Sequence, residues 1–142
     1  MNDQFYLKKA IEVGNQISAP YNFGAVVVQD GAILSVEHNH VQEEHDPTRH
    51  AEVSAIVAAC KKLGSHHIDG AVLYASHEPC TMCLACAAWA HISRIVYATP
   101  ANEQQPGMYE LKHPDIEALA AQLNNPIRVE QISVTLKDRS NN

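Results

Sequence analysis

Apolar residues near the start of the chain recur at the spacing of a helix. The residues with this spacing are Tyr6, Ala10, Val13 and Ile17. Positions three or four residues apart lie on one face of an α-helix, so the pattern predicts an amphipathic helix. Because proline cannot continue a helix, we expect this helix to end before Pro20.

Two apolar runs after this helix predict a β-hairpin. The runs cover residues 25–28 and 32–36, and a short polar segment, 29–31, separates them. Gly31 suits the turn position that requires a positive φ, because glycine has no Cβ to clash there. We therefore expect two antiparallel strands joined by a tight turn.

Two alanine-rich segments in the middle of the chain predict helices. Asp46-Pro47 is typical of a helix start, since Asp caps the first turn and Pro fits it, and the helix is expected to run to Leu63. A second helix is expected over residues 79–91. The segments 50–52 and 79–83 then lie at the N-terminal ends of helices, where the helix dipole favours thiolates and other anions.

Short strands alternate with helices in the second half of the chain. Strands are expected over residues 72–74 and 95–97, a helix over 114–123, and a last strand over 127–136, whose alternation breaks near 130–131. This order implies parallel strands joined by right-handed crossovers. We therefore predict an α/β fold with three α/β/α layers, in which a five-stranded mixed sheet has its last three strands parallel.

The composition sets limits on the class of protein. A chain of 142 residues that is 46% hydrophobic suits one compact domain over residues 1–142. No run approaches the ~18 apolar residues that cross a bilayer, and the first residues lack the pattern of a secretory signal. We expect a cytoplasmic protein with no membrane contact. Without such a signal, the cluster of Cys80, Cys83 and Cys86 favours metal chemistry over disulfides.

The charge balance limits the partners that the chain can bind. Its formal net charge is −6, with 16 acidic and 10 basic side chains. Binding to a long phosphate backbone depends on basic surface, so a tRNA partner is disfavoured. A small, neutral substrate is the expectation.

Two short segments in the middle of the chain carry the candidate chemistry. They supply three residues of the kind that bind zinc: His50, Cys80 and Cys83. A structural zinc site is closed by four protein ligands, whereas a catalytic site has three and leaves a place for water. Glu52, two residues from His50, is placed to accept the proton of that water. The pattern predicts a hydrolytic zinc enzyme.

Cys86 leaves a different class of protein open. It extends the spacing to Cys-x-x-Cys-x-x-Cys, which is compatible with a closed Cys3His zinc site or an iron–sulfur centre. A closed site would make the chain a non-catalytic structural zinc-binding module. We expect Cys86 to be an inert helix-packing residue, and the number of protein ligands separates the two hypotheses.

Further short segments accompany the zinc-binding ones, and together they form a specific pattern. They are Phe23-Gly24-Ala25-Val26, Asp30-Gly31, Asn39, Asp46-Pro47-Thr48, His50-Ala51-Glu52, Glu78-Pro79-Cys80-Thr81-Met82-Cys83-Leu84 and Trp89-Ala90. This pattern resembles the zinc-dependent cytidine and deoxycytidylate deaminase superfamily, and is most similar to its bacterial guanine deaminase branch. The resemblance covers roughly residues 5–98. The tail beyond is weakly matched and shorter than in guanine deaminases.

The resemblance implies a role for each matching residue. Zinc is held by His50, Cys80 and Cys83, and Glu52 moves a proton from water to a ring nitrogen and the departing amine. The implied substrate contacts are Asn39, the backbone of Ala51, Ser76, Phe23 and Trp89. Asn39 is alternatively a simple turn residue, and Trp89 is alternatively a core residue. Glu103 falls roughly where guanine deaminases have a second acidic residue that assists proton transfer.

The function that follows is zinc-dependent hydrolytic deamination of a free nucleobase or related heterocycle, with guanine as the leading substrate. Cytosine deaminases and tRNA adenosine deaminases share the zinc-binding pattern, so both stay open as alternatives. The resemblance also implies a homodimer that packs through the metal-bearing helices. Its partners would be a small nucleobase and a second copy of the chain.

Overall fold

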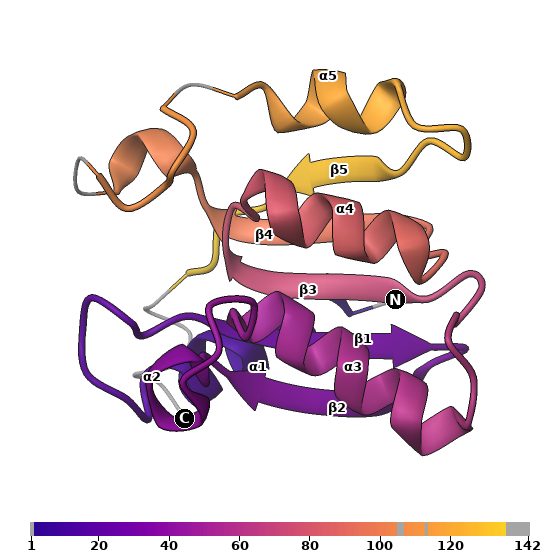
Figure 1. The fold of residues 1–142 in the computed structure, drawn as a ribbon, viewed down its shortest axis with the longest axis horizontal. Coiled ribbons are helices and arrows are strands. Elements are labelled where there is room, and N and C mark those ends of the chain that lie inside the picture. Colours follow the sequence, from indigo (N-terminus) through magenta and orange to yellow (C-terminus); the bar gives the residue numbers. More distant parts are fainter. Residues whose placement is uncertain (1, 105–106, 113, 136–142) are drawn as a thin grey trace.

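A computed structural model describes residues 2–104, 107–112 and 114–135 of the chain. It contains a five-stranded sheet with strand order β2-β1-β3-β4-β5 and helices on both faces (Figure 1). The elements are α1 (Asp3–Gly14), β1 (Gly24–Gln29), β2 (Ala32–His38), α2 (Val41–Glu44), α3 (Ala51–Leu63), β3 (Val72–His77), α4 (Thr81–Trp89), β4 (Arg94–Thr99), the 3-10 helix η1 (Ala101–Glu103), α5 (Ile116–Ala121) and β5 (Arg128–Gln131).

The strand directions confirm the predicted mixed sheet. β1 pairs antiparallel with both β2 and β3, whereas β3, β4 and β5 are parallel to one another. The hairpin turn is also confirmed, since Asp30 and Gly31 both have positive φ angles, of 50° and 77°. Both central residues of the turn therefore adopt the left-handed conformation that matches the twist of two-residue hairpins.

Alternating side chains of the strands build two hydrophobic cores. Val27, Leu73 and Ile95 point to the face covered by α3, α4 and α5, and none of the three is exposed. Their sequence neighbours Val26, Tyr74 and Val96 point to the opposite face, under α1. Successive side chains of a strand face opposite sides, so a sheet covered by helices on both faces has apolar residues at consecutive positions. The three-layer α/β/α architecture is confirmed.

The helix that carries Glu52 begins later than predicted. α3 starts at Ala51, with His50 as its N-cap residue, rather than at Asp46-Pro47. The Asp46 side chain accepts hydrogen bonds from the backbone N–H and the hydroxyl of Thr48 instead, which closes a local turn. Asp side chains form such turns as readily as they cap helices, and only the surrounding packing separates the two outcomes.

Two further boundaries differ from the sequence-based expectation. α1 ends at Gly14, because the N–H groups of Gln16 and Ile17 bond to carbonyls three residues back and tighten the chain into a turn. β5 ends at Gln131, where the hydrophobic alternation breaks, and Leu136 lies outside the described residues. Within the described ranges, the helices are too short or too polar to cross a bilayer.

Candidate metal centre

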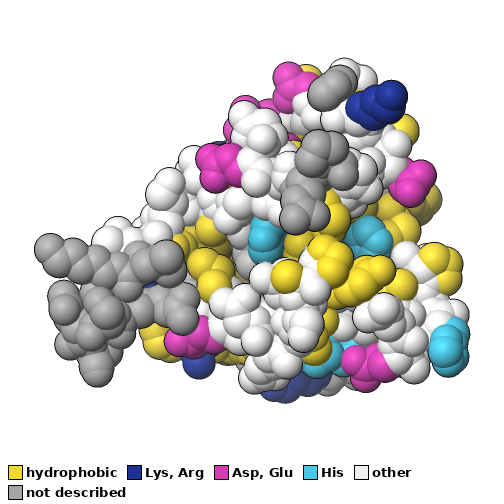
Figure 2. Space-filling model, turned by 90° about the vertical axis from the view of Figure 1, so that its left-hand side faces the viewer, with side chains coloured by type: hydrophobic (Ala, Val, Ile, Leu, Met, Phe, Trp, Pro, Cys, Tyr) yellow, Lys and Arg dark blue, Asp and Glu magenta, His cyan; other side chains and the backbone are white. Residues whose placement is uncertain are grey.

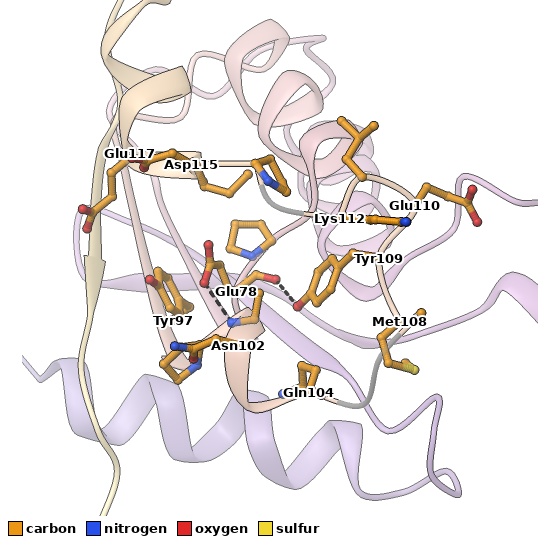
Figure 3. A pocket seen from close by; sticks show the side chains of 17 residues that line it. Glu78, Tyr97, Asn102, Gln104, Met108, Tyr109, Glu110, Lys112, Asp115 and Glu117 are labelled. Atoms are coloured by element: carbon orange, nitrogen blue, oxygen red, sulfur yellow. Dashed lines mark hydrogen bonds between the residues drawn. The ribbon is translucent and has the colours of Figure 1, made fainter.

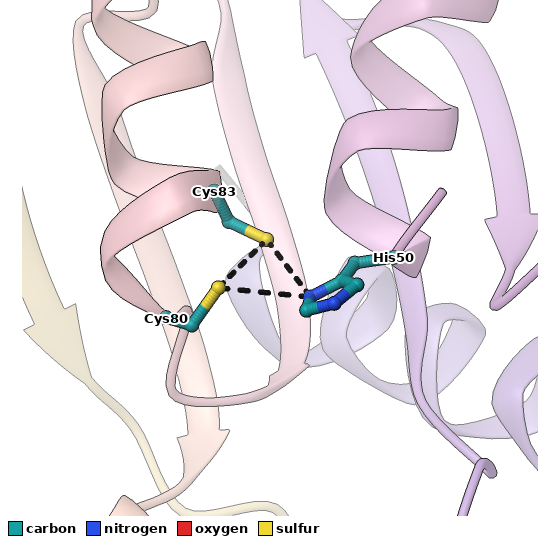
Figure 4. Close-up of side chains that lie close together, drawn as sticks. All are labelled: His50, Cys80 and Cys83. Atoms are coloured by element: carbon teal, nitrogen blue, oxygen red, sulfur yellow. Dashed lines mark hydrogen bonds between the residues drawn. The ribbon is translucent and has the colours of Figure 1, made fainter. Parts of the chain in front are cut away.

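The three predicted zinc ligands come together because two helices start at the same edge of the sheet. His50 is the N-cap residue of α3, and Cys80 is the N-cap residue of α4, with Cys83 in the first turn. α3 and α4 pack side by side on one face of the sheet, so their N-terminal ends are neighbours (Figure 1). The sulfur atoms of the two cysteines point toward the His50 ring (Figure 4).

The distances between the three donor atoms suit one zinc ion. The two sulfurs lie 3.5 Å apart, and each lies 3.6 Å from Nδ1 of His50. In a tetrahedral site with Zn–S bonds of about 2.3 Å and a Zn–N bond of about 2.0 Å, two sulfurs are roughly 3.8 Å apart and a sulfur and a nitrogen roughly 3.5 Å. Thiolate and imidazole are also a donor set that favours zinc. The residues present therefore fit the metal.

The surroundings favour a thiolate at Cys80. Its contact with Cys83, and the neighbouring His50, lower the pKa of the Cys80 thiol to about 4. The same contact and burial raise the pKa of Cys83, so the pair shares one negative charge before a metal displaces the remaining proton. Both cysteines lie at the start of α4, where unpaired backbone N–H groups favour negative charge.

Glu52 has the environment expected of a proton carrier. Its side chain lies in the first turn of α3 and is only 3% exposed. Burial raises the pKa of this carboxyl to about 7, and its Oε1 forms no hydrogen bond within the described part of the chain. A buried polar atom without a partner is costly, so such atoms concentrate where a ligand completes them. A group with a pKa near neutrality can both accept and return a proton.

The start of β1 and the end of β3 bring two predicted substrate positions to the same edge. The hydroxyl of Ser76 accepts a hydrogen bond of 2.9 Å from the backbone N–H of Gly24, and this hydroxyl is buried. The residue before Gly24 stacks on the residue after Ser76, since the ring centroids of Phe23 and His77 lie 3.9 Å apart and the rings are nearly parallel. Burial lowers the pKa of His77 to about 4, so its ring is neutral near pH 7.

Asn39 follows β2 and reaches this edge through a local turn. Its Oδ1 accepts a hydrogen bond of 2.9 Å from the N–H of Val41, which leaves the amide Nδ2 available to donate. The next residue, His40, binds Arg49 through the backbone at 2.9 Å and places the turn beside the residue that precedes His50. Asn39 is thus a turn residue. Within the part of the chain that the structure describes, its amide nitrogen makes no hydrogen bond and can donate one to a ligand.

A cavity of about 1080 Å³ borders the metal-binding loop. Its wall includes Glu78 and Pro79, which directly precede Cys80, together with residues of the segment 107–112 (Figure 3). The three donor residues themselves are not among the lining residues. The cavity therefore lies beside the metal centre rather than around it.

Tyr109 is a residue of this cavity that sequence reasoning missed. Its hydroxyl donates a hydrogen bond of 2.7 Å to the backbone carbonyl of Glu78 (Figure 3). This bond places the phenol beside the loop that leads to Cys80. Burial raises the pKa of Tyr109, and the carboxylates of Glu52 and Glu78 add to the effect. The segment around it has no hydrophobic period or motif, so no sequence signal could have singled it out.

Three residues considered from the sequence are not part of the donor group. Trp89 is 82% exposed at the opposite end of α4 from Cys80, so the interpretation of Trp89 as a core residue is wrong. Glu103 is exposed on η1 and does not line the cavity. Cys86 is not among the described side chains whose donor atoms gather around His50, which weighs against a closed Cys3His site.

Ala51 is the first residue of α3 and is fully buried. The carboxyl ends of β3, β4 and β5 lie on the side of the molecule that faces the viewer in Figure 2. Hydrophobic side chains and histidines gather in the middle of this face, and acidic groups lie around its rim (Figure 2). Open α/β sheets bind ligands at the carboxyl ends of their strands. The arrangement offers a small, partly apolar site beside a metal.

The curated proteins that the chain resembles include a guanine deaminase and several tRNA-specific adenosine deaminases. The chain is 45% identical over 103 residues to guanine deaminase of Bacillus subtilis, and this match covers 69% of this chain and 65% of the relative. It is also 34% identical over 100 residues to tRNA-specific adenosine deaminase of Aquifex aeolicus, and this match covers 69% of this chain and 66% of the relative. The chain thus spans just under two thirds of the length of each.

Solved structures give the same two groups. A structure from a study of A-to-I editing by tRNA A34 deaminases matches 93% of this chain and 100% of its own, with a TM-score of 0.79 and 27% identity. Guanine deaminase from Bacillus subtilis matches 88% of this chain and 73% of its own, with a TM-score of 0.68 and 37% identity.

The family follows from a match that contains all three donor residues. Residues 1–99 match the model of the cytidine and deoxycytidylate deaminase zinc-binding region. This range ends with β4 and includes the N-terminal ends of α3 and α4, where the donor atoms meet. The chain therefore belongs to the cytidine and deoxycytidylate deaminase zinc-binding family.

Proposed function

We propose that the chain catalyses hydrolytic deamination of a free nucleobase, with guanine or a related amino-purine as substrate. The observation that carries the proposal is the carboxyl of Glu52, which is buried and lies two residues from His50. Among the described residues, its Oε1 has no hydrogen-bond partner. In a purely structural zinc site, a buried carboxyl without a partner would only lower the stability of the fold. A hydrolytic site requires such a carboxyl to transfer the protons of water.

The donor set and Glu52 divide the chemistry between them. His50, Cys80 and Cys83 would hold the zinc ion, which would supply a nucleophile near neutral pH by lowering the pKa of water from 15.7 to about 7. Glu52 would carry the two protons of that water in turn, the first to the ring nitrogen and the second to the departing amine. A C–O bond forms at the amidine carbon and the C–N bond breaks, so that ammonia leaves and the oxygen of the water becomes a ring carbonyl.

The sheet edge supplies contacts that suit a planar base. The free Nδ2 of Asn39 can donate to a ring acceptor, and the backbone of Ala51 and Ser76 offers polar groups to the ring edge. The stacked pair of Phe23 and His77 provides an aromatic surface for a ring. These contacts orient a small heterocycle without a sugar or phosphate, which agrees with the net charge of −6.

Deamination of adenosine in tRNA is the second candidate. It is favoured by the relative from Aquifex aeolicus and by the fold match to the tRNA A34 deaminase study. The excess of 16 acidic over 10 basic side chains opposes it, because a folded polyanion binds through basic surface. The free base is therefore the stronger proposal.

A homodimer that packs through α4 completes the proposal. Trp89 and Ala85 are one helical turn apart and both are exposed, with Trp89 at 82%. A large aromatic side chain that stays exposed on an apolar helix is typical of a surface that another protein covers. A second copy of α4 offers the same flat, alanine-rich face in return, as a two-fold symmetric dimer requires.

A substrate panel tests the proposed activity. Zinc-loaded protein is given guanine, adenine or cytosine, and ammonia release is measured, with Glu52→Gln as the inactive control. In parallel, an anticodon stem-loop with adenosine at the wobble position is analysed for inosine. Release of ammonia from guanine by the wild type, but not by Glu52→Gln, would support the proposal. Inosine formation without ammonia from any free base would replace it with the tRNA activity.

A further inference from the structure

A second group of metal-binding side chains lies far from the donor triangle. His67 and Asp69 belong to the loop between α3 and β3, and His91 belongs to the turn between α4 and β4. These connections are at the start of β3 and the end of α4, whereas Cys80 lies at the other end of both elements. At about 3.3 Å per strand residue and 1.5 Å per helix residue, the two groups are roughly 15–20 Å apart.

The three side chains converge on a single point. Nδ1 of His67 lies 2.8 Å from Oδ1 of Asp69, and Nδ1 of His91 lies 2.9 Å from the same oxygen. The two imidazole rings stack with their centroids 4.6 Å apart and 24° between their planes. His91 thus joins His67 and Asp69 from 22 or more positions along the chain, and two nitrogens meet one carboxylate oxygen.

The backbone holds these side chains in place whether or not a ligand is bound. Ile68, between His67 and Asp69, is 1% exposed, and its N–H donates to the carbonyl of Ala90 at 2.8 Å. This bond ties the first loop to the residue before His91. In addition, the side chain of Gln29 donates to the carbonyl of Asp69 at 3.0 Å, so the hairpin also anchors the loop.

His91 itself has a positive φ of 61°, in the left-handed region. Residues other than glycine adopt this region rarely, and histidine, asparagine and aspartate do so more often than the rest. The helix α4 ends just before, and this conformation turns the imidazole back toward the first loop. The ring is thereby aimed at the Asp69 carboxylate.

We propose that His67, Asp69 and His91 form a second cation site that binds zinc or a similar divalent first-row transition ion. Two imidazoles and one carboxylate are a set that such ions accept, with remaining positions taken by water. The ion would replace the protons that now join the nitrogens to the carboxylate. It would clamp the loop after α3 to the turn after α4. Magnesium and calcium, which prefer all-oxygen sites, would bind poorly.

The experiment titrates Zn²⁺ into protein that already carries one zinc per chain, with binding followed by calorimetry and by metal analysis after dialysis. The wild type should take up a second equivalent. His67→Ala and His91→Asn should each weaken this second event by at least the 10- to 100-fold that is typical of damaged metal sites. Asparagine keeps the left-handed conformation of residue 91 while it removes the imidazole, so the variant should fold.

Two controls separate this site from others. His66→Ala alters an exposed neighbour outside the group and should leave the second event unchanged. Cys80→Ala should lose the tightly bound zinc but keep the second event. The absence of a second equivalent in the wild type would overturn the proposal, and so would its retention in both His67→Ala and His91→Asn.

Discussion

The hydroxyl of Tyr109 donates a 2.7 Å hydrogen bond to the carbonyl of Glu78, two residues before Cys80, which is one of the three predicted zinc donors. The side chain of Glu78 in turn accepts a hydrogen bond of 2.9 Å from the N–H of Ala101. The segment after β4 therefore holds the loop that leads into α4 by two contacts, one to the backbone of Glu78 and one to its side chain. Through these bonds the C-terminal third of the chain positions the metal-binding loop.

Replacing Tyr109 with Phe tests this support. Loss of one hydrogen bond of about 0.5–1.5 kcal/mol should lower kcat/KM by roughly 2- to 10-fold, with zinc retained. Steady-state kinetics and metal analysis of Tyr109→Phe give the result. Tyr21→Phe removes a hydroxyl at an exposed position, where no hydrogen bond of the side chain is found among the described residues, and as the control it should behave as the wild type. Equal kinetics for both variants would argue against the supporting role.

Zinc content distinguishes the three-ligand site from a four-ligand one. Cys80→Ala removes one of three donors, so we expect the tightly bound zinc to be lost. Cys86→Ala leaves the donor triangle intact and should retain one zinc per chain. Elemental analysis after dialysis measures both. Loss of zinc from Cys86→Ala at normal stability would instead favour the closed structural site.

Glu52→Gln separates catalysis from stability. The substitution removes an ionisable carboxyl whose burial is unfavourable, so the unfolding temperature should stay the same or rise. Activity should fall by several orders of magnitude, because Gln cannot accept the proton. Calorimetry and ammonia release report the two effects independently. A variant that is active, or one that unfolds well below the wild type, would contradict the assigned role.

The stability of the protein should depend on pH through Asp3. Its carboxylate accepts hydrogen bonds of 3.0 and 2.9 Å from Arg94 and one of 2.6 Å from Tyr74. The Arg94 bonds lower the pKa of Asp3 below its ordinary value of 3.8, despite partial burial. A carboxyl with a depressed folded pKa stabilises the protein fully above its unfolded pKa, and this contribution is lost as the pH falls through the folded value.

Asp3→Asn measures that contribution. Near neutral pH the variant should be less stable than the wild type by about 1–3 kcal/mol, since hydrogen bonds to charged groups are lost. The difference should shrink below about pH 4 as the wild-type carboxyl takes up a proton. Urea unfolding at a series of pH values gives the curves, and Glu12→Gln, at an exposed position, serves as control. A difference that is constant with pH would refute the assignment.

Trp89→Lys tests the proposed dimer. A charge in place of the 82% exposed indole should prevent association through α4, because an unpaired charge is costly at an apolar interface. Light scattering should give a dimer for the wild type and a monomer for the variant. His45→Lys changes the charge at an exposed position far along the chain and should remain dimeric. A monomeric wild type at micromolar concentration would exclude the dimer.

The sequence by itself determined the metal centre and most of the sheet. His50, Cys80 and Cys83 could be named because ligand type and spacing are local properties, and the strands could be placed because hydrophobic alternation is local as well. The parallel order of β3, β4 and β5 followed from the helices between them, since a crossover requires such a connection. The predicted single domain over residues 1–142 stays a prediction.

Tertiary structure alone decided the features that depend on distant contacts. It set the start of α3, because Asp46 could cap a helix or close a turn with equal local merit. It brought Tyr109 to the carbonyl of Glu78, and His91 to Asp69, across gaps that no sequence period spans. It also left Trp89 exposed, although the residue type alone favours burial. In each case local sequence allowed several conformations, and the packing of the helices on the sheet selected one.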